Sequence, residues 1–451
     1  MSNFDLIIRN GTIVTHDRES VGDIGISDGS IAALGSNLSG PARLEINATG
    51  LHVFPALIDA HVHYNEPGRT GWEGIETGSQ ALAAGGGTLF FDMPLNAHPP
   101  TLDAGSFDLK LAAATKNSLV DFSFWGGLVP QNLDRLEELA DRGVIGFKAF
   151  MADSGIGDFP CADEKTLREG MKRAAKLGKL VAVHAESEPL TSRLARQKVA
   201  QGKISIRDYL DSRPVEAELA AIRQAVDLAG ETRCALHIVH VSSGGGVALV
   251  AAAKKLGVDV TCETCPHYLT LTEADAEKLG GVAKCAPPLR DAPTVEKLWE
   301  QVLAGGVTTI GSDHSPSPPG MKTDANFFKV WGGISGVQHT LPLLLTEGHV
   351  KRGAALSLVA QLTSFNVARR FDLPQTKGRI ETGADADFAL ADLKQHFSVR
   401  AGDLFYRHRQ SPYVGRALTG RVIQTILRGQ TVFTNGKIVS SPAGRLVKPQ
   451  R

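Results

Sequence analysis

One repeating pattern constrains the fold of this chain more than any other feature. From residue 53 onward, a short apolar run with a polar end is followed by a stretch of helical periodicity, and this unit recurs eight times. Runs that are apolar throughout are typical of strands buried on both faces, as in parallel sheets. The eight runs are residues 53–63, 87–96, 120–129, 144–150, 180–186, 235–243, 258–268 and 307–314. Eight strands alternating with helices predict a (β/α)8 barrel, an α/β fold.

The two ends of the chain follow a different pattern. Residues 4–53 alternate apolar and polar positions around Asn-Gly and Asp-Gly turns, which is typical of β-hairpins, and the C-terminal stretch is similar. We therefore expect one small β-sandwich built from both ends. The predicted division is residues 1–53 and 371–451 for the sandwich and residues 54–370 for the barrel. A length of 451 residues suits a barrel with a smaller accessory domain.

Charge and cysteine content exclude several classes of partner and compartment. Lys plus Arg and Asp plus Glu both number 48, so the formal charge is zero and no basic stripe marks a nucleic-acid or anionic-membrane partner. No apolar run approaches the roughly 20 residues needed to span a bilayer, and the N-terminus lacks a signal-peptide pattern. Five cysteines, an odd number, do not suggest a disulfide framework. These features predict a cytoplasmic protein with a small-molecule substrate.

Histidines and an aspartate stand where the predicted strands end, and barrel enzymes carry their chemistry at that edge. His61 and His63 close the first run and face the same side, because residues i and i+2 of a strand do so. His184 ends the fifth run, His240 lies near the end of the sixth, and Asp313 near the end of the eighth. These side chains suit a zinc-like ion. A lone His-x-His could be two surface histidines, but three further strand ends with the same chemistry favour metal ligation.

Lys148 lies inside an apolar run, Val-Ile-Gly-Phe-Lys-Ala-Phe. Burying an ammonium group is costly, and burial favours the free amine. A free amine can add carbon dioxide to give a carbamate, which is a carboxylate-like anion able to bridge two metal ions. The alternative is a structural lysine paired with a carboxylate. The histidines and the aspartate at the other strand ends favour the carbamate.

Neighbouring histidines and cysteines receive separate interpretations. His237 should face away from His240 and be a packed, hydrogen-bonded residue, and His267 should play a supporting role. His314 should point off the barrel axis, where a supporting role and a catalytic role are equally expected. The Cys-x-x-Cys of residues 262 and 265 places its thiols on opposite faces of a strand, which argues against a redox or zinc role.

Taken in chain order, these residues resemble the metal ligands of the amidohydrolase superfamily, specifically of its cyclic amidohydrolases: dihydroorotases, hydantoinases and allantoinases. The resemblance covers essentially the whole chain. The matching positions are His61, His63, Lys148, His184, His240 and Asp313. By this resemblance one divalent ion takes the first histidine pair and Asp313, and a second takes His184 and His240. Lys148, converted by carbon dioxide to N6-carboxylysine, would bridge the ions, which would be zinc before cobalt, manganese or iron.

Within that group, several segments resemble allantoinases. They are residues 63–74, 92–96, 263–271, 312–322 and 329–336, of which the Asp-His-Ser-Pro-x-Pro-Pro stretch is the most specific. Dihydroorotases typically have Met-Pro-Asn-Thr where this chain has Met-Pro-Leu-Asn. The resemblance implies hydrolysis of the hydantoin ring of allantoin to allantoate, with Asp313 as general base and then acid, and a homo-oligomer, expected to be a tetramer. The implied substrate contacts are Asn96, Cys285, Ala286 and Gly332.

Two alternatives remain at this point. The first is a hydantoinase or dihydropyrimidinase, which would perform the same chemistry on another cyclic amide. The second is a catalytically inactive homologue that serves as a scaffold, since a fold can outlive its site. A scaffold would be expected to have lost some ligands, and all six are retained here.

Overall fold

The computed structural model describes residues 4–450, and within them the expected barrel is confirmed. Neighbouring barrel strands are all parallel. The strands are β6 (Leu57–Val62), β7 (Gly87–Asp92), β8 (Asp121–Phe124), β9 (Gly126–Gly127), β10 (Gly146–Phe150), β11 (Leu180–His184), β12 (Leu236–Ile238), β13 (Val260–Thr264) and β14 (Thr309–Ile310). β8 and β9 together form one barrel strand, which is interrupted at Trp125. The barrel closes where Val62 bridges His314 and His63 N donates to His314 O at 2.8 Å.

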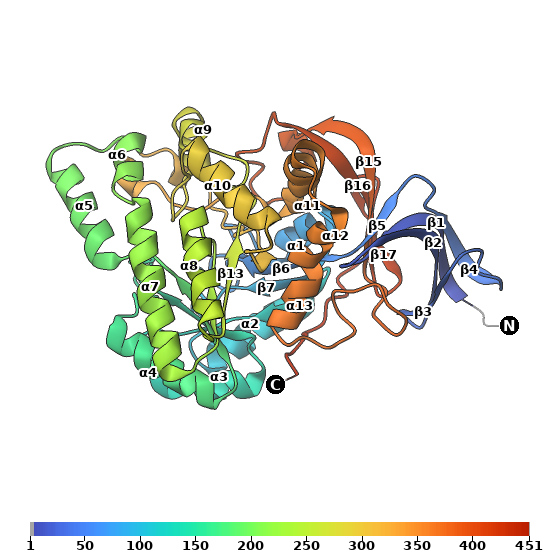
Figure 1. Ribbon diagram of the computed structural model, residues 1–451, viewed down its shortest axis with the longest axis horizontal. Helices are drawn as coiled ribbons and strands as arrows, with labels where there is room; N and C mark the ends of the chain where they lie inside the picture. The colour runs from blue at the N-terminus through green and yellow to red at the C-terminus, as the bar shows by residue number, and fades with distance from the viewer. Residues whose placement is uncertain (1–3, 451) are drawn as a thin grey trace.

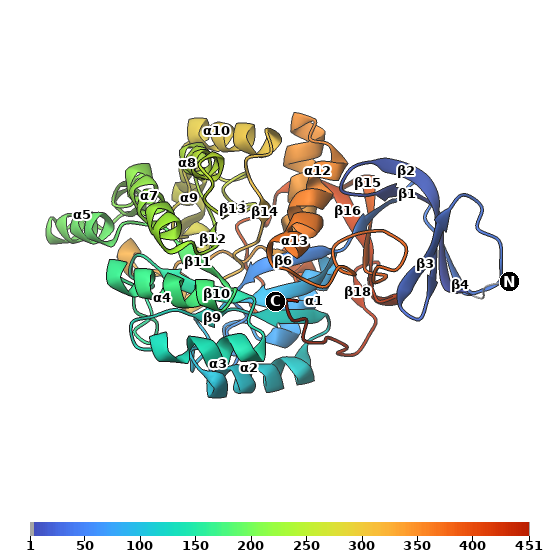
Figure 2. The same ribbon diagram turned by 60° about the horizontal axis from the view of Figure 1, so that its bottom comes forward.

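Helices surround the barrel, as Figures 1 and 2 show. They are α1 (Ile75–Ala84), α2 (Ala104–Asn117), α3 (Leu136–Arg142), α4 (Glu164–Lys176), α5 (Glu188–Ala200), α6 (Ile206–Asp211), α7 (Val215–Thr232), α8 (Gly244–Lys255), α9 (Glu273–Leu279), α10 (Ala292–Leu303), α11 (Thr340–Leu343), α12 (Leu356–Ala360) and α13 (Asn366–Arg370). α4 shows why such segments form: the Asp163 side chain caps its N-terminus by accepting from Thr166 N, and Leu167, Met171 and Ala174 make one buried face.

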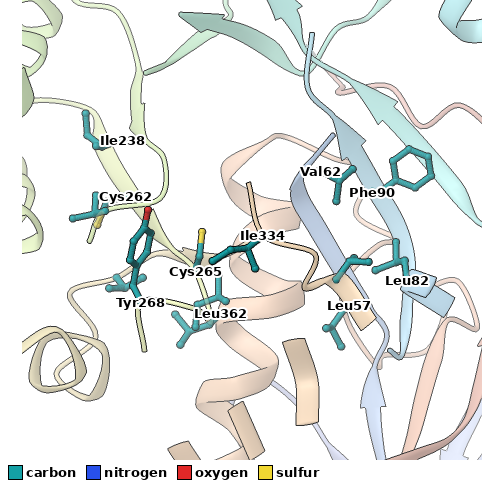
Figure 3. Packing of buried hydrophobic residues seen from close by; sticks show 14 of the residues in the cluster. Leu57, Val62, Leu82, Phe90, Ile238, Cys262, Cys265, Tyr268, Ile334 and Leu362 are labelled. Carbon is teal, nitrogen blue, oxygen red and sulfur yellow. The ribbon is translucent and has the colours of Figure 1, made fainter. Parts of the chain in front are cut away.

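The barrel wall and its helices share one apolar core. Figure 3 shows Leu57 and Val62 of β6 and Phe90 of β7 close to Leu82 of α1. The first residue of β7 makes this packing possible, because a Cβ at Gly87 would lie 2.2 Å from Leu82 Cδ1. Close packing of this kind gives the strands a rigid frame for the side chains at their ends.

Both chain ends build the accessory domain, as expected. Its strands are β1 (Phe4–Val14), β2 (Glu19–Ser27), β3 (Ser30–Gly35), β4 (Ala42–Asn47), β5 (His52–Pro55), β15 (Phe388–Ser398), β16 (Ala417–Leu427), β17 (Gln430–Thr434) and β18 (Lys437–Ile438). They form a continuous sheet in the order β18-β17-β16-β15-β5-β1-β2-β3, with β4 on β1. β5 joins the two ends because it pairs with both β1 and β15. The blue and red strands of Figure 1 show this union.

The C-terminal tail returns to the barrel. Phe122 N donates to Arg445 O at 3.0 Å and Val447 N donates to Phe122 O at 2.8 Å, so the tail lies along β8. We propose that residues 1–53 and 371–451 form the accessory domain and residues 54–370 the barrel domain. The C-terminal tail is the part of residues 371–451 that contacts the barrel. Within residues 4–450, no helix combines the length and apolar character that a bilayer crossing requires.

Candidate metal centre

Three of the expected ligands meet at the closure of the barrel. His61 Nε2 lies 3.2 Å and His63 Nε2 lies 3.4 Å from Asp313 Oδ1. One candidate ligand atom from each residue lies within 4.8 Å of the others, and all three residues are buried. His61 lies on β6, His63 directly follows that strand, and the loop after β14 supplies the aspartate. A set of two imidazoles and a carboxylate at this spacing can hold a divalent metal ion.

The other two histidines face each other beside this cluster. His184 ends β11, and its Nδ1 lies 3.1 Å from Nε2 of His240. The rings of His61 and His240 have centroids 5.4 Å apart, so the second pair adjoins the first cluster. Two ring nitrogens turned toward a common point offer a second set of metal donors.

Lys148 is fully buried in the middle of β10. Among the described residues its Nζ has no hydrogen-bond partner, and it lies 5.0 Å from the centroid of the Phe150 ring. Burial lowers the pKa of Lys148 to about 7, against the opposing charges of Asp313 and Glu263. The alternative of a lysine paired with a carboxylate finds no contact in the described part of the chain.

Two buried glutamates orient the histidines, and neither was identified from the sequence. Glu263 Oε1 lies 2.7 Å from Nδ1 of His61, and Glu186 Oε2 lies 2.9 Å from Nε2 of His184. Arg213 pairs with the same oxygen of Glu186. Such carboxylates fix the tautomer and orientation of metal-binding imidazoles. The signal was a charged residue inside an apolar run, the argument already applied to Lys148.

Backbone conformation at the site is unusual. His240, Asp313 and Asn96 have φ values of 41°, 44° and 69°, in the left-handed region that side-chain-bearing residues seldom adopt. Such conformations persist where the surrounding structure imposes them, and they cluster at functional sites. The tightly packed barrel rim therefore fixes where these three side chains lie.

The histidines around Asp313 favour the ionised form of its carboxyl group. Burial alone would raise the pKa of this carboxyl group, but His61, a hydrogen bond from His63 and His240 together hold the pKa well below its usual range. By contrast, burial raises the pKa of Glu263 to about 8. The two carboxyl groups at this site therefore differ in their readiness to accept a proton.

The neighbouring histidines and cysteines lie mostly as expected. His237 Nδ1 is 2.8 Å from Thr261 Oγ1, and its ring packs against Phe371, so it is a packed, hydrogen-bonded residue. His314 accepts at Nδ1 from Gly336 N at 3.1 Å, and its Nε2 lies 3.7 Å from Glu73 Oε2.

The remaining three residues are also buried. His267 is enclosed without a hydrogen-bond partner for either ring nitrogen among the described residues. Cys262 and Cys265 are free thiols packed in the hydrophobic core. Burial raises the pKa of both thiols above the ordinary value, which favours the thiol over the reactive thiolate.

A cavity of about 310 Å³ opens above these residues. Its lining includes His61, His63, His184, His240 and Asp313, and also the four expected substrate contacts Asn96, Cys285, Ala286 and Gly332. The structure thus brings loops after several strands to one pocket over the candidate metal ligands. A Cβ placed on Gly332 would meet no heavy atom within 4 Å.

Comparison with known proteins agrees with this arrangement. The model of the amidohydrolase family matches residues 52–432. The chain belongs to the amidohydrolase family. Members of this family are metal-dependent, and the His61, His63 and Asp313 cluster of this amidohydrolase fits such a role.

Curated relatives and solved structures are similar over the full length of this amidohydrolase. It is 59% identical to an allantoinase from Rubrobacter xylanophilus, covering 100% of this chain and 99% of the relative. It is 52% identical to an allantoinase from Deinococcus radiodurans, covering 99% of both. Among solved structures, an L-hydantoinase (dihydropyrimidinase) from Arthrobacter aurescens is 34% identical with a TM-score of 0.96, covering 99% of this chain and 100% of that one.

Proposed function

We propose that this amidohydrolase opens the hydantoin ring of allantoin by hydrolysis, giving allantoate. Identity of 59% and 52% to allantoinases over nearly the whole chain supports this substrate. The observation that carries the proposed chemistry is the meeting of two sets of metal donors, His61–His63–Asp313 and His184–His240, under one cavity. A hydantoinase or dihydropyrimidinase is the second candidate, favoured by the similarity of the folds.

The donor set fits two divalent ions. Imidazole nitrogens and carboxylates are the ligands that zinc and similar ions prefer. His61, His63 and Asp313 would hold one ion, and His184 and His240 the other. When bound, two divalent ions supply a nucleophilic water at neutral pH and polarise the carbonyl group that it attacks.

Lys148 would complete both sets as N6-carboxylysine. Its buried Nζ, without a partner among the described residues, is what carbamylation requires, since only the neutral amine reacts. The amine forms an N–C bond to carbon dioxide and releases one proton, which leaves a carboxylate-like anion. This anion would replace an unpaired buried amine with a group that bridges the two ions.

Residues of the chain would then manage protons and orientation. The ionised carboxylate of Asp313 takes a proton from the attacking water and delivers it to the departing ring nitrogen. Glu263 and Glu186 hold the His61 and His184 rings through their second nitrogens. Asn96 and the backbone at Cys285, Ala286 and Gly332 would contact the ring and its ureido arm. Of these, the carbonyl of Cys285 already accepts from Tyr209 Oη at 2.9 Å.

Zinc as the metal, a homotetramer and a cytoplasmic location are further proposals that rest on the family resemblance. Metal analysis and a native mass measurement test the first two directly.

A product assay tests the function. Metal-loaded protein is incubated with allantoin, and the product is identified by NMR and compared with authentic allantoate. We expect one new carboxylate per allantoin consumed, with the ureido arm intact. Release of urea, or no turnover of allantoin, would contradict the proposal.

A further inference from the structure

The loop of residues 327–333 forms one wall of the cavity above the candidate metal centre. It begins with the 3-10 turn η4 (Phe327–Lys329) and leads to Gly333. Phe328, Trp331 and Gly332 line the cavity. Little regular structure holds this segment in place, so its position depends on contacts from elsewhere in the chain.

Lys284 holds the first half of this loop. Its buried Nζ donates to the backbone oxygens of Phe327 at 2.6 Å, Val330 at 2.5 Å and Phe328 at 3.3 Å. The same Nζ lies 4.4 Å from the centroid of the Tyr209 ring. A carbonyl-lined position over an aromatic face suits an ammonium group.

Lys322 holds the second half. Its buried Nζ donates to the backbone oxygens of Trp331 at 2.9 Å and Gly333 at 2.6 Å. Gly333 N in turn donates to Lys284 O at 2.7 Å, so the two lysine segments and the loop form one unit. Neither ammonium forms an ion pair within residues 4–450.

The two lysines leave the backbone N–H and C=O of one residue in this loop free to bind a ligand. Lys322 bonds the carbonyl groups of Trp331 and Gly333 on both sides of Gly332, Lys284 bonds that of Val330, and the N–H groups of Trp331 and Gly333 are also bonded. Among the described residues, only the N–H and C=O of Gly332 in this stretch lack a hydrogen-bond partner. Gly332 borders the cavity, so its backbone is available to a ligand.

We propose that Lys284 and Lys322 are positioning residues that hold the 327–333 loop through its carbonyl groups and thereby present the Gly332 backbone to the substrate ring. The proposal rests on the proposed cyclic-amide hydrolysis. Two buried ammonium groups without carboxylate partners are costly. Replacing either lysine by an apolar side chain of similar size would leave the loop carbonyl groups that it bonds without that partner. Their cost is explained if the loop geometry that they impose is needed for substrate binding.

Lys284→Met and Lys322→Met test the proposal, with Lys278→Met, an exposed lysine on α9, as the matched control. We expect each of the first two variants to lose roughly tenfold in kcat/KM for allantoin, mainly through KM, because a charged hydrogen-bond network is lost. Metal content should stay at the wild-type value and the control should be unchanged. Wild-type KM in both folded variants would overturn the proposal.

Gly332→Ala shows whether the lysines act through the backbone of Gly332. The added methyl group meets no protein atom within 4 Å, so it should disturb the substrate and not the fold. If Lys284 acts through Gly332, the double variant Lys284→Met with Gly332→Ala should lose less in kcat/KM than the product of the single losses. Fully multiplicative losses would contradict this route.

Hydrogen exchange gives a readout that does not depend on activity. In the wild-type protein, the amides of Trp331 and Gly333 should exchange slowly for a loop, and the Lys→Met variants should accelerate exchange across residues 327–333 alone. Rapid exchange of these two amides in wild-type protein would overturn the proposal. If allantoin is not hydrolysed but exchange is slow, the proposed function fails and the positioning of the loop stands.

Discussion

The candidate site has two parts, one formed by the barrel strands and the other by the loops above the strands. Residues on or directly after strands, such as His61, Lys148 and His184, are the proposed metal ligands and are held by buried packing and by hydrogen bonds between parallel strands. The cavity wall, in contrast, comes from loops carrying Asn96 and Gly332, which side chains such as the buried lysines hold in place. The comparison indicates that the strands fix a chemistry that many cyclic amides could undergo, and that the loops determine which of them binds.

Metal removal should have the largest effect, because it disables the whole part of the site that lies at the strand ends. Exhaustive chelation should reduce turnover to the background rate, and adding a divalent metal should restore it. Metal analysis should find about two ions per chain when all six ligands are occupied. Full activity in protein shown to be metal-free would contradict the assignment.

Lys148→Ala should have almost as large an effect. Losing the proposed carbamate removes a ligand common to both ions, so turnover should fall by on the order of a thousandfold or more. Metal content should fall while the far-UV circular dichroism stays unchanged. A short carboxylic acid should restore part of the activity by occupying the vacated space.

Lys116→Ala, an exposed lysine on α2, is the control for this change and should behave as wild type. Normal metal content and rate in Lys148→Ala would exclude the carbamate.

Asp313→Asn tests proton transfer separately from metal binding at the strand ends. An amide cannot accept the proton, so kcat should fall by about 10²–10⁴-fold. His61 and His63 remain, so part of the metal should be retained. Near-normal kcat, measured at saturating substrate, would point to another base such as His314.

Glu263→Gln should have the smallest effect, because it alters a ligand's orientation and removes no ligand. Its carboxylate lies 2.7 Å from His61 Nδ1, and loss of such a partner typically costs 10- to 100-fold in metal affinity or activity. Titrating metal into the apo variant measures the first quantity. An affinity equal to wild type would show that Glu263 does not orient His61.

The sequence predicted the strand-borne residues better than the loops. A period of two placed His61 and His63 on one side, and the barrel topology brought distant strand ends together. Strand lengths were less predictable: the run 307–314 contains β14 of only Thr309–Ile310, and Asp313 beyond it has a φ of 44°, which an extended strand does not allow.

Contacts that support the site were beyond sequence reasoning. Lys284 bonds carbonyl groups 43 and 46 positions away, and Glu263 reaches His61 202 positions away. No local periodicity encodes such pairs, because they depend on how the loops and strands pack in three dimensions. A charged residue inside an apolar run can be recognised from the sequence, but the group that it contacts cannot.

The most direct test of the central claim compares specificity constants for allantoin, hydantoin, dihydrouracil and dihydroorotate in one metal-loaded preparation. All four rings offer a carbonyl group to the same metal centre, so a preference must arise from the loop wall that meets the ureido arm. Polar groups that lose their partner when the arm is missing can discriminate by several orders of magnitude. The account predicts the highest kcat/KM for allantoin. Efficient hydrolysis of hydantoin or dihydrouracil without hydrolysis of allantoin would contradict it.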